Sequence, residues 1–208
     1  GFGNTMAAEM EKGYQMGARC LKISKTLGLR ARDKTGELIP VDDRRLDPVW
    51  RKCAELEIPV MIHTADPVAF WTPLDRHNER MIELIDHPEW AYGPEFPDRD
   101  ELIRQRNRVI ERHPETTFVA LHMAGSPEDL QTVGIWLDKY PNMYVETGAR
   151  LSELGRQPYT ARRFFIKYQD RIMFGTDSCP IPGAKLAENG EAMLPPHWRW
   201  FQTDHEYF

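Results

Sequence analysis

Four apolar segments of this chain end in a residue that can bind a metal ion or carry a proton. Two of these residues are histidines, His63 and His122, and two are carboxylates, Glu146 and Asp177. Imidazole and carboxylate groups together are typical ligands of zinc and similar divalent cations. A cation with an open coordination position lowers the pKa of its bound water to about 7, which yields a hydroxide nucleophile. One remaining group must then transfer the proton.

The segments that position these residues alternate with helical patterns. An amphipathic stretch at 102–110, for example, precedes the strand that ends at His122. Strands that are joined by helices form parallel sheets. In a parallel barrel the carboxyl ends of all strands meet on one face, where active sites are built. We therefore expect the four strand-end residues to lie close together.

Five strands can be counted, the first at 19–24. An eight-stranded barrel typically needs about 250 residues, and this chain has 208. The pattern predicts the later strands of a TIM (β/α)8 barrel in a single partial domain over 1–208. A doubly wound open sheet is the alternative, but it normally carries a glycine-rich phosphate-binding turn after an early strand, and the sequence has no such turn.

A long segment at about 66–98 interrupts the alternation and is rich in proline and aromatic residues. A segment of this length beyond a strand end is typically a lid or pocket wall, and a packed excursion over the barrel rim is the alternative. Trp71 follows His63 by eight residues. We expect Trp71 to form an apolar wall of a substrate pocket and Trp90 to pack the segment onto the barrel.

Alternation along the strands supports an inward direction for both histidines. Met61 and His63 are two residues apart and share one face of their strand. By the same count Ala120 and His122 share a face, so that Val119 is expected to face the helices.

Two further polar residues, Arg150 and Lys22, have two interpretations each. Arg150 either binds a substrate carboxylate or is a solvated loop residue. Lys22 either points into the barrel, where it needs a partner or a function, or is solvated. Glu146 is expected to accept hydrogen bonds beside the ligands rather than to be a ligand, and Cys179 lacks the surroundings of a cysteine nucleophile. The histidines treated as structural are His77, His87, His113, His197 and His205.

Composition limits the partners. The net charge of −5 argues against nucleic acid and anionic membranes, and no apolar run approaches the length of a membrane span. Three cysteines without close pairs do not form a disulfide framework, which fits a reducing compartment, with the cytoplasm as the default. The expected partner is a small-molecule substrate, and a homo-oligomer is compatible with the sequence.

Five of the segments resemble the amidohydrolase superfamily, and within it the amidohydrolase 2 branch that includes aminocarboxymuconate-semialdehyde decarboxylase. The resemblance runs over nearly the whole chain, and its most specific element is the closing Phe-Gly-Thr-Asp. The segments are GARCLKI at 17–23, IPVMIH at 58–63, VALHMAG at 119–125, NMYVE at 142–146 and RIMFGTD at 171–177.

The resemblance implies a barrel of the metal-dependent hydrolase type. It implies that His63 and Asp177 bind the metal, that His122 is a further ligand or the acid/base, and that Asp177 and His122 are catalytic. Zinc is the expected metal. The family's first strand ends in His-x-His, which is absent from this sequence, and we expect that strand to precede the chain.

The implied function is a hydrolase that uses metal-activated water on an amide, lactone or similar carbonyl substrate. A metal-dependent non-oxidative decarboxylase with the same ligands is an alternative. A noncatalytic barrel fragment without the first-strand ligands is another.

Overall fold

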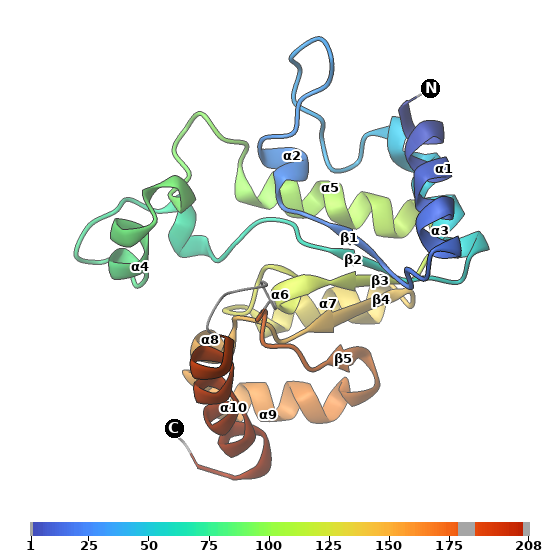
Figure 1. Ribbon diagram of the computed structural model, residues 1–208. Coiled ribbons are helices and arrows are strands. Elements are labelled where there is room, and N and C mark those ends of the chain that lie inside the picture. The colour runs from blue at the N-terminus through green and yellow to red at the C-terminus, as the bar shows by residue number, and fades with distance from the viewer. Residues whose placement is uncertain (1, 179–185, 206–208) are drawn as a thin grey trace.

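The five strands form one parallel sheet whose spatial order follows the sequence. In the computed structural model, which describes residues 2–178 and 186–205, the order is β1-β2-β3-β4-β5 and every neighbouring pair is parallel (Figure 1). A doubly wound sheet would reverse its order at a switch point, so the sequential order is that of a barrel. The strands are Leu21–Ile23 (β1), Val60–Ile62 (β2), Phe118–Ala120 (β3), Met143–Glu146 (β4) and Ile172–Met173 (β5).

Each strand is preceded by a long helix. These helices are α1 (Phe2–Gln15), α3 (Asp47–Glu55), α5 (Arg99–Arg112), α7 (Leu130–Lys139) and α9 (Pro158–Lys167), and α10 (Leu186–Gln202) follows β5. Shorter elements lie in the connections: α2 (Thr26–Leu29), α4 (Met81–Asp86), α6 (Leu121–Ala124), α8 (Leu151–Gly155), and the 3-10 turns η1 (Arg44–Leu46), η2 (Val68–Trp71), η3 (Pro88–Trp90) and η4 (Gln169–Arg171). None of the described helices is long and apolar enough to cross a membrane.

Local sequence explains where the main helices begin. Asp98 accepts a hydrogen bond from the backbone N–H of Glu101 at the start of α5, and Asp129 does the same for Thr132 at the start of α7. Both are N-cap interactions that satisfy an otherwise free backbone donor. The first turn of α3 contains a proline, where the missing N–H costs nothing.

One face of the sheet is packed and the opposite face is open. The ring of Trp50 in α3 packs edge-on against Phe118 of β3, with ring centroids 6.2 Å apart. Six strand side chains on this helix-covered face are completely buried: Val60, Ile62, Phe118, Ala120, Met143 and Val145. On the other face Lys22 and Met173 are exposed. The open face corresponds to the interior of a barrel.

The register of β3 corrects one sequence prediction. Met61 lies opposite Val119, and paired residues of neighbouring parallel strands project to the same face. Val119, and not Ala120, therefore shares the face of Met61. The prediction was wrong because it extended the strand alternation as far as His122, whereas the strand ends at Ala120 and the backbone of His122 is left-handed, with φ 58°.

The segment at 66–98 has a small aromatic core of its own. The ring of Tyr92 contacts Trp71 and Phe96, with centroids 4.3 and 5.0 Å away, and the indole N–H of Trp71 donates to the carbonyl of Pro97 at 3.1 Å. The Tyr92 hydroxyl donates to Asp66 at 2.9 Å, which ties the segment to the end of β2. Figure 1 shows α4, in the middle of this segment, projecting away from the sheet.

Candidate active site

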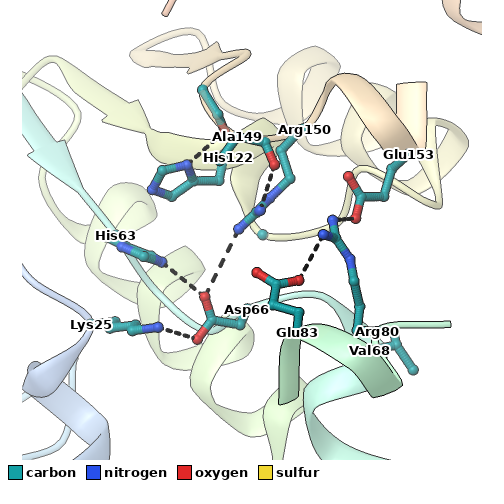
Figure 2. A network of polar contacts seen from close by, with 12 residues as sticks. Lys25, His63, Asp66, Val68, Arg80, Glu83, His122, Ala149, Arg150 and Glu153 are labelled. Carbon is teal, nitrogen blue, oxygen red and sulfur yellow. Dashed lines mark hydrogen bonds and ion pairs between the residues drawn. The ribbon is translucent and has the colours of Figure 1, made fainter. Parts of the chain in front are cut away.

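The imidazole rings of His63 and His122 face each other at the carboxyl ends of β2 and β3. Their centroids are 4.2 Å apart and the ring planes meet at 62°. In each ring Nε2 is buried and has no hydrogen-bond partner. A buried nitrogen without a partner costs free energy unless something binds it. Figure 2 shows Nε2 of His63 directed at Asp66, whereas no contact is drawn to Nε2 of His122.

The contacts of His122 define its tautomer. Its Nδ1 lies 2.8 Å from the carbonyl oxygen of Gly148. A carbonyl only accepts hydrogen bonds, so Nδ1 carries the proton and Nε2 offers a lone pair. Burial, and after it the neighbouring His63 and Arg150, lowers the pKa of His122 to about 3. The ring is therefore neutral at pH 7 and suited either to bind a cation or to accept a proton.

A buried carboxylate, Asp66, faces His63. Its Oδ1 is 3.4 Å from His63 Nε2, which is long for a hydrogen bond. Lys25 and Tyr92 donate to Oδ2 of Asp66 at 2.6 and 2.9 Å. Burial opposes the charge on Asp66, but the contact with His63 and the charge of Lys25 outweigh it and lower the pKa of Asp66 to about 2. Asp66 is thus ionised at neutral pH and orients the ring of His63.

Both carboxylate oxygens of Glu146, at the end of β4, accept hydrogen bonds from backbone N–H groups. Its Oε1 accepts from the N–H of His122 and its Oε2 accepts from the N–H of Gly148, each at 2.6 Å. The side chain is buried. With both oxygens engaged, Glu146 joins the turn after β3 to the loop after β4.

Arg150 is buried beside this pair of loops, so the alternative of a solvated loop residue does not hold. Only 6% of the residue is exposed. Its Nη1 donates to the carbonyl of Ala149 at 2.7 Å, its Nη2 lies 3.9 Å from Asp66 Oδ1, and its Nε has no partner. Figure 2 shows the guanidinium between His122 and Asp66.

Asp177 lies at the same rim but its side chain is exposed. Strand β5 ends at Met173, earlier than predicted, and Asp177 has a left-handed backbone with φ 65°. A Cβ placed on Gly148 would be 3.1 Å from the backbone nitrogen of Asp177, so the two loops are adjacent. Within the described part of the chain, no three His, Cys, Asp or Glu side chains form a group that could hold a metal ion. The structure thus brings together two of the three predicted ligands.

Two further candidate residues, Lys22 and Trp71, have neighbours other than the histidine rings. Lys22 is exposed on the open face of the sheet, where its charge makes a small contribution to the low pKa of His122. Trp71 contacts Tyr92 within the segment 66–98 and lines a cavity of about 610 Å³ there. Cys179 falls outside the described residues.

Sequence reasoning missed Asp66 and Lys25. Both follow a strand end within four residues, as His63 and His122 do, and this position was the available signal. It also missed Arg106, which is fully buried in α5 at a spacing typical of the apolar stripe. An arginine in an apolar stripe indicates a buried polar partner.

The amidohydrolase family model matches residues 2–205. This chain belongs to the amidohydrolase family. The predicted resemblance is confirmed, and no curated protein matches the chain.

Solved structures of similar fold cover nearly the whole chain. A 2,6-dihydroxybenzoate decarboxylase from Rhizobium is 18% identical, with 96% of this chain and 67% of that chain covered and a TM-score of 0.53. A dihydroxybenzoic acid decarboxylase from Polaromonas, solved with manganese and 2-nitroresorcinol, is 18% identical, with coverages of 96% and 65% and a TM-score of 0.51. A dihydroorotase from Campylobacter jejuni is 16% identical, with coverages of 94% and 55% and a TM-score of 0.50. At this identity the likeness shows the fold, and the chain spans 55–67% of the length of these three proteins.

Proposed function

We propose that this chain carries the core of a metal-dependent active site that acts on a carbonyl or carboxyl carbon of a small molecule. The supporting observation is the pair of His63 and His122, whose ring centroids lie 4.2 Å apart and whose buried Nε2 atoms make no hydrogen bond. The carboxylate of Asp66 lies 3.4 Å from Nε2 of His63. Two such nitrogens at converging strand ends are typical of a cation site in a barrel. A purely structural histidine pair would be expected to satisfy those nitrogens within the protein.

The two histidine rings offer two ligands for a divalent cation, and a third ligand is needed to complete the site. His63 and His122 would hold it through ring nitrogens, and Asp177 is the proposed third ligand. When bound, such a cation polarises a carbonyl oxygen or acidifies a water molecule. Zinc suits imidazole and carboxylate ligands, and manganese is present in the Polaromonas decarboxylase of similar fold.

The remaining residues have roles that follow from their contacts. Neutral His122 is the proton carrier if it does not bind the cation. Arg150 is buried and its Nε–H has no partner, which supports a role in binding a substrate carboxylate. Trp71 is the proposed apolar wall of the substrate pocket. Asp66 and Glu146 orient His63 and His122.

Both hydrolysis and non-oxidative decarboxylation are compatible with this site. Hydrolysis is the first candidate, since a neutral histidine beside a cation can handle the proton of an attacking water. The buried guanidinium of Arg150 favours decarboxylation as the second candidate, because a substrate that loses carbon dioxide must present a carboxylate. The two differ in products: only hydrolysis incorporates an oxygen atom of labelled water into the product acid, and only decarboxylation releases carbon dioxide.

Metal titration tests the proposal directly. Metal-free protein is titrated with Zn²⁺ and Mn²⁺ in a calorimeter, and we expect saturable binding of about one ion per chain. His63→Ala and Asp177→Ala should each weaken binding by roughly 10-fold or more. His87→Ala is the matched control, since its half-exposed ring lies in the segment 66–98. Wild-type affinity in His63→Ala would refute the proposed site.

A further inference from the structure

The turn that carries His122 is held in an unfavourable backbone conformation. Four consecutive residues have positive φ: His122 at 58°, Met123 at 53°, Ala124 at 56° and Gly125 at 69°. Only glycine adopts this left-handed region without steric cost. Three successive non-glycine residues remain there only if the surrounding structure fixes them.

Two buried arginines of α5 hold the carbonyl groups of this turn. Arg106 donates through Nη1 to the carbonyl of Ala124, and Arg99 donates through Nη2 to the carbonyl of Gly125. Arg99 also donates through Nε to the backbone carbonyl of Asp66 at 3.0 Å. The same guanidinium therefore connects the turn of His122 to the loop that follows His63.

Close packing supports this connection. A Cβ at Gly125 would lie 2.7 Å from the carbonyl oxygen of Thr64, the residue after His63. Glycine is required at this position both for the left-handed backbone and for this approach. The turn and the His63 loop are thus in direct contact.

Arg106 is an unusual residue for a purely structural purpose. Only 1% of it is exposed. Its other donors, Nε and Nη2, both bind Oδ1 of Asn107 at 3.1 and 2.9 Å, and the ring of Trp136 lies 4.9 Å from the guanidinium carbon. Burial lowers the pKa of Arg106 to about 9, and the positive charge of Arg99 contributes a smaller lowering. No carboxylate of the described residues raises this pKa in return. A buried charge without a carboxylate partner is costly compared with an apolar side chain.

We propose that Arg106, assisted by Arg99, is a positioning residue that fixes the left-handed turn so that Nδ1–H of His122 meets the Gly148 carbonyl and the lone pair of Nε2 is left without a hydrogen-bond donor. Arg106 acts through the backbone and touches no reacting atom. The inference rests on the proposed function for its catalytic meaning, but the orientation of the His122 ring can be measured without metal or substrate.

Two variants of Arg106 and one control test the proposal. Arg106→Met keeps the side-chain length and removes every donor, and Arg106→Lys keeps the charge but cannot reach Ala124 and Asn107 with a planar fork. Arg108→Met is the matched control on the same helix, because Arg108 is exposed and pairs with Asp42 and Glu101.

The first readout is the tautomer of His122 in metal-free protein, observed in long-range ¹H–¹⁵N correlation spectra of the histidine rings. We expect wild type and Arg108→Met to show a single Nδ1–H tautomer. Arg106→Met should show the two ring nitrogens of His122 shifted towards a common averaged value, with a smaller shift in Arg106→Lys.

The second readout is the affinity for Zn²⁺, which should fall roughly 10–100-fold in Arg106→Met, the usual effect of losing an orienting contact. A folded Arg106→Met with the wild-type tautomer would overturn the inference, even if its melting temperature fell. Failure of both Arg106 variants to fold would also overturn it, because Arg106 would then serve stability alone. If wild type binds no Zn²⁺ but the tautomer changes as expected, the proposed function fails and the positioning role stands.

Discussion

The ends of β3 and β5 each carry a residue that can bind a metal ion, but the two residues have very different surroundings. His122, after β3, is buried, and its backbone and ring are held by Glu146 and Gly148. Asp177, after β5, is exposed and follows a strand of two residues. Strand β3 lies between β2 and β4, whereas β5 is paired on one side only, with β4, among the residues that the structure describes.

The difference shows what a strand-end residue requires. His122 receives anchors from the loop of β4 on one side and contacts His63 of β2 on the other. Asp177 has a neighbouring strand on one side only within the described sheet. A central strand end can therefore hold a side chain in one orientation, while a side chain at an edge has fewer groups to fix it.

The largest effect should follow from His122→Asn. If His122 carries the proton, this change should lower turnover by roughly 10²–10⁴-fold while metal binding is retained, because Asn cannot accept and release a proton. Turnover and metal content are measured on the same preparation. Loss of both would make His122 a ligand, and unchanged turnover would remove it from either role.

A second test compares stability at the two strand ends. Glu146→Ala leaves two buried N–H groups without acceptors, so the free energy of unfolding should fall by roughly 2–4 kcal/mol. Asp177→Asn alters an exposed side chain and keeps a residue type that tolerates the left-handed backbone, so it should change this free energy by less than about 0.5 kcal/mol. Urea denaturation measures both. Equal losses of unfolding free energy in the two variants would show that the end of β3 is not fixed more firmly than the end of β5.

The pH dependence of stability should also differ between the two ends. His122 has its folded pKa lowered to about 3, whereas the unfolded chain takes up the proton near the ordinary value of about 6.5. Between these values the unfolded state binds more protons, so the free energy of unfolding falls as pH is lowered from about 6.5 towards 3, by at most about 1.4 kcal/mol per pH unit from this group.

His122→Gln should remove this slope, and Asp177→Asn should keep it. Urea titrations at a series of pH values measure the effect. An unchanged slope in His122→Gln would show that the ring is not held neutral in the folded protein.

The smallest effect concerns the backbone of the turn. Ala124→Gly should leave the free energy of unfolding within about 0.5 kcal/mol of wild type, because relief of the left-handed strain offsets the entropy cost of glycine and the loss of a buried methyl group. Ala54→Gly, inside α3, is the control and should lower the free energy of unfolding by about 0.5–1 kcal/mol. Destabilisation by Ala124→Gly beyond that range would mean that the turn carries little strain.

The sequence was sufficient to predict the architecture because the relevant signals are local. Apolar runs separated by amphipathic helices predict parallel strands in sequential order, and the five strands follow this order. The proximity of His63 and His122 followed from the same topology. These properties depend on periodicity and connection length alone.

The orientation of the side chains could not be predicted because it depends on contacts between distant residues. The left-handed turn at His122 exists through Glu146 and Arg106. Glu146 accepts from the backbone N–H of His122, 24 positions earlier, and Arg106 donates to the carbonyl of Ala124, 18 positions later. Lys25 meets Asp66 across 41 positions. No local pattern encodes such pairs. The end of the strand at Ala120 was therefore not visible in the sequence, and extending its alternation to His122 led to the wrong face for Val119.

The attachment of the segment 66–98 has a consequence for evolution. Asp66 receives the hydroxyl of Tyr92 on its side chain and the guanidinium of Arg99 on its carbonyl, so both ends of the segment are fastened at one residue. The entropy cost of closing a loop grows only slowly with its length. Insertions and deletions in the exposed stretch at 72–77, before α4, can therefore accumulate at little thermodynamic cost, so that selection can reshape this part of the segment while the pair of histidines stays in place.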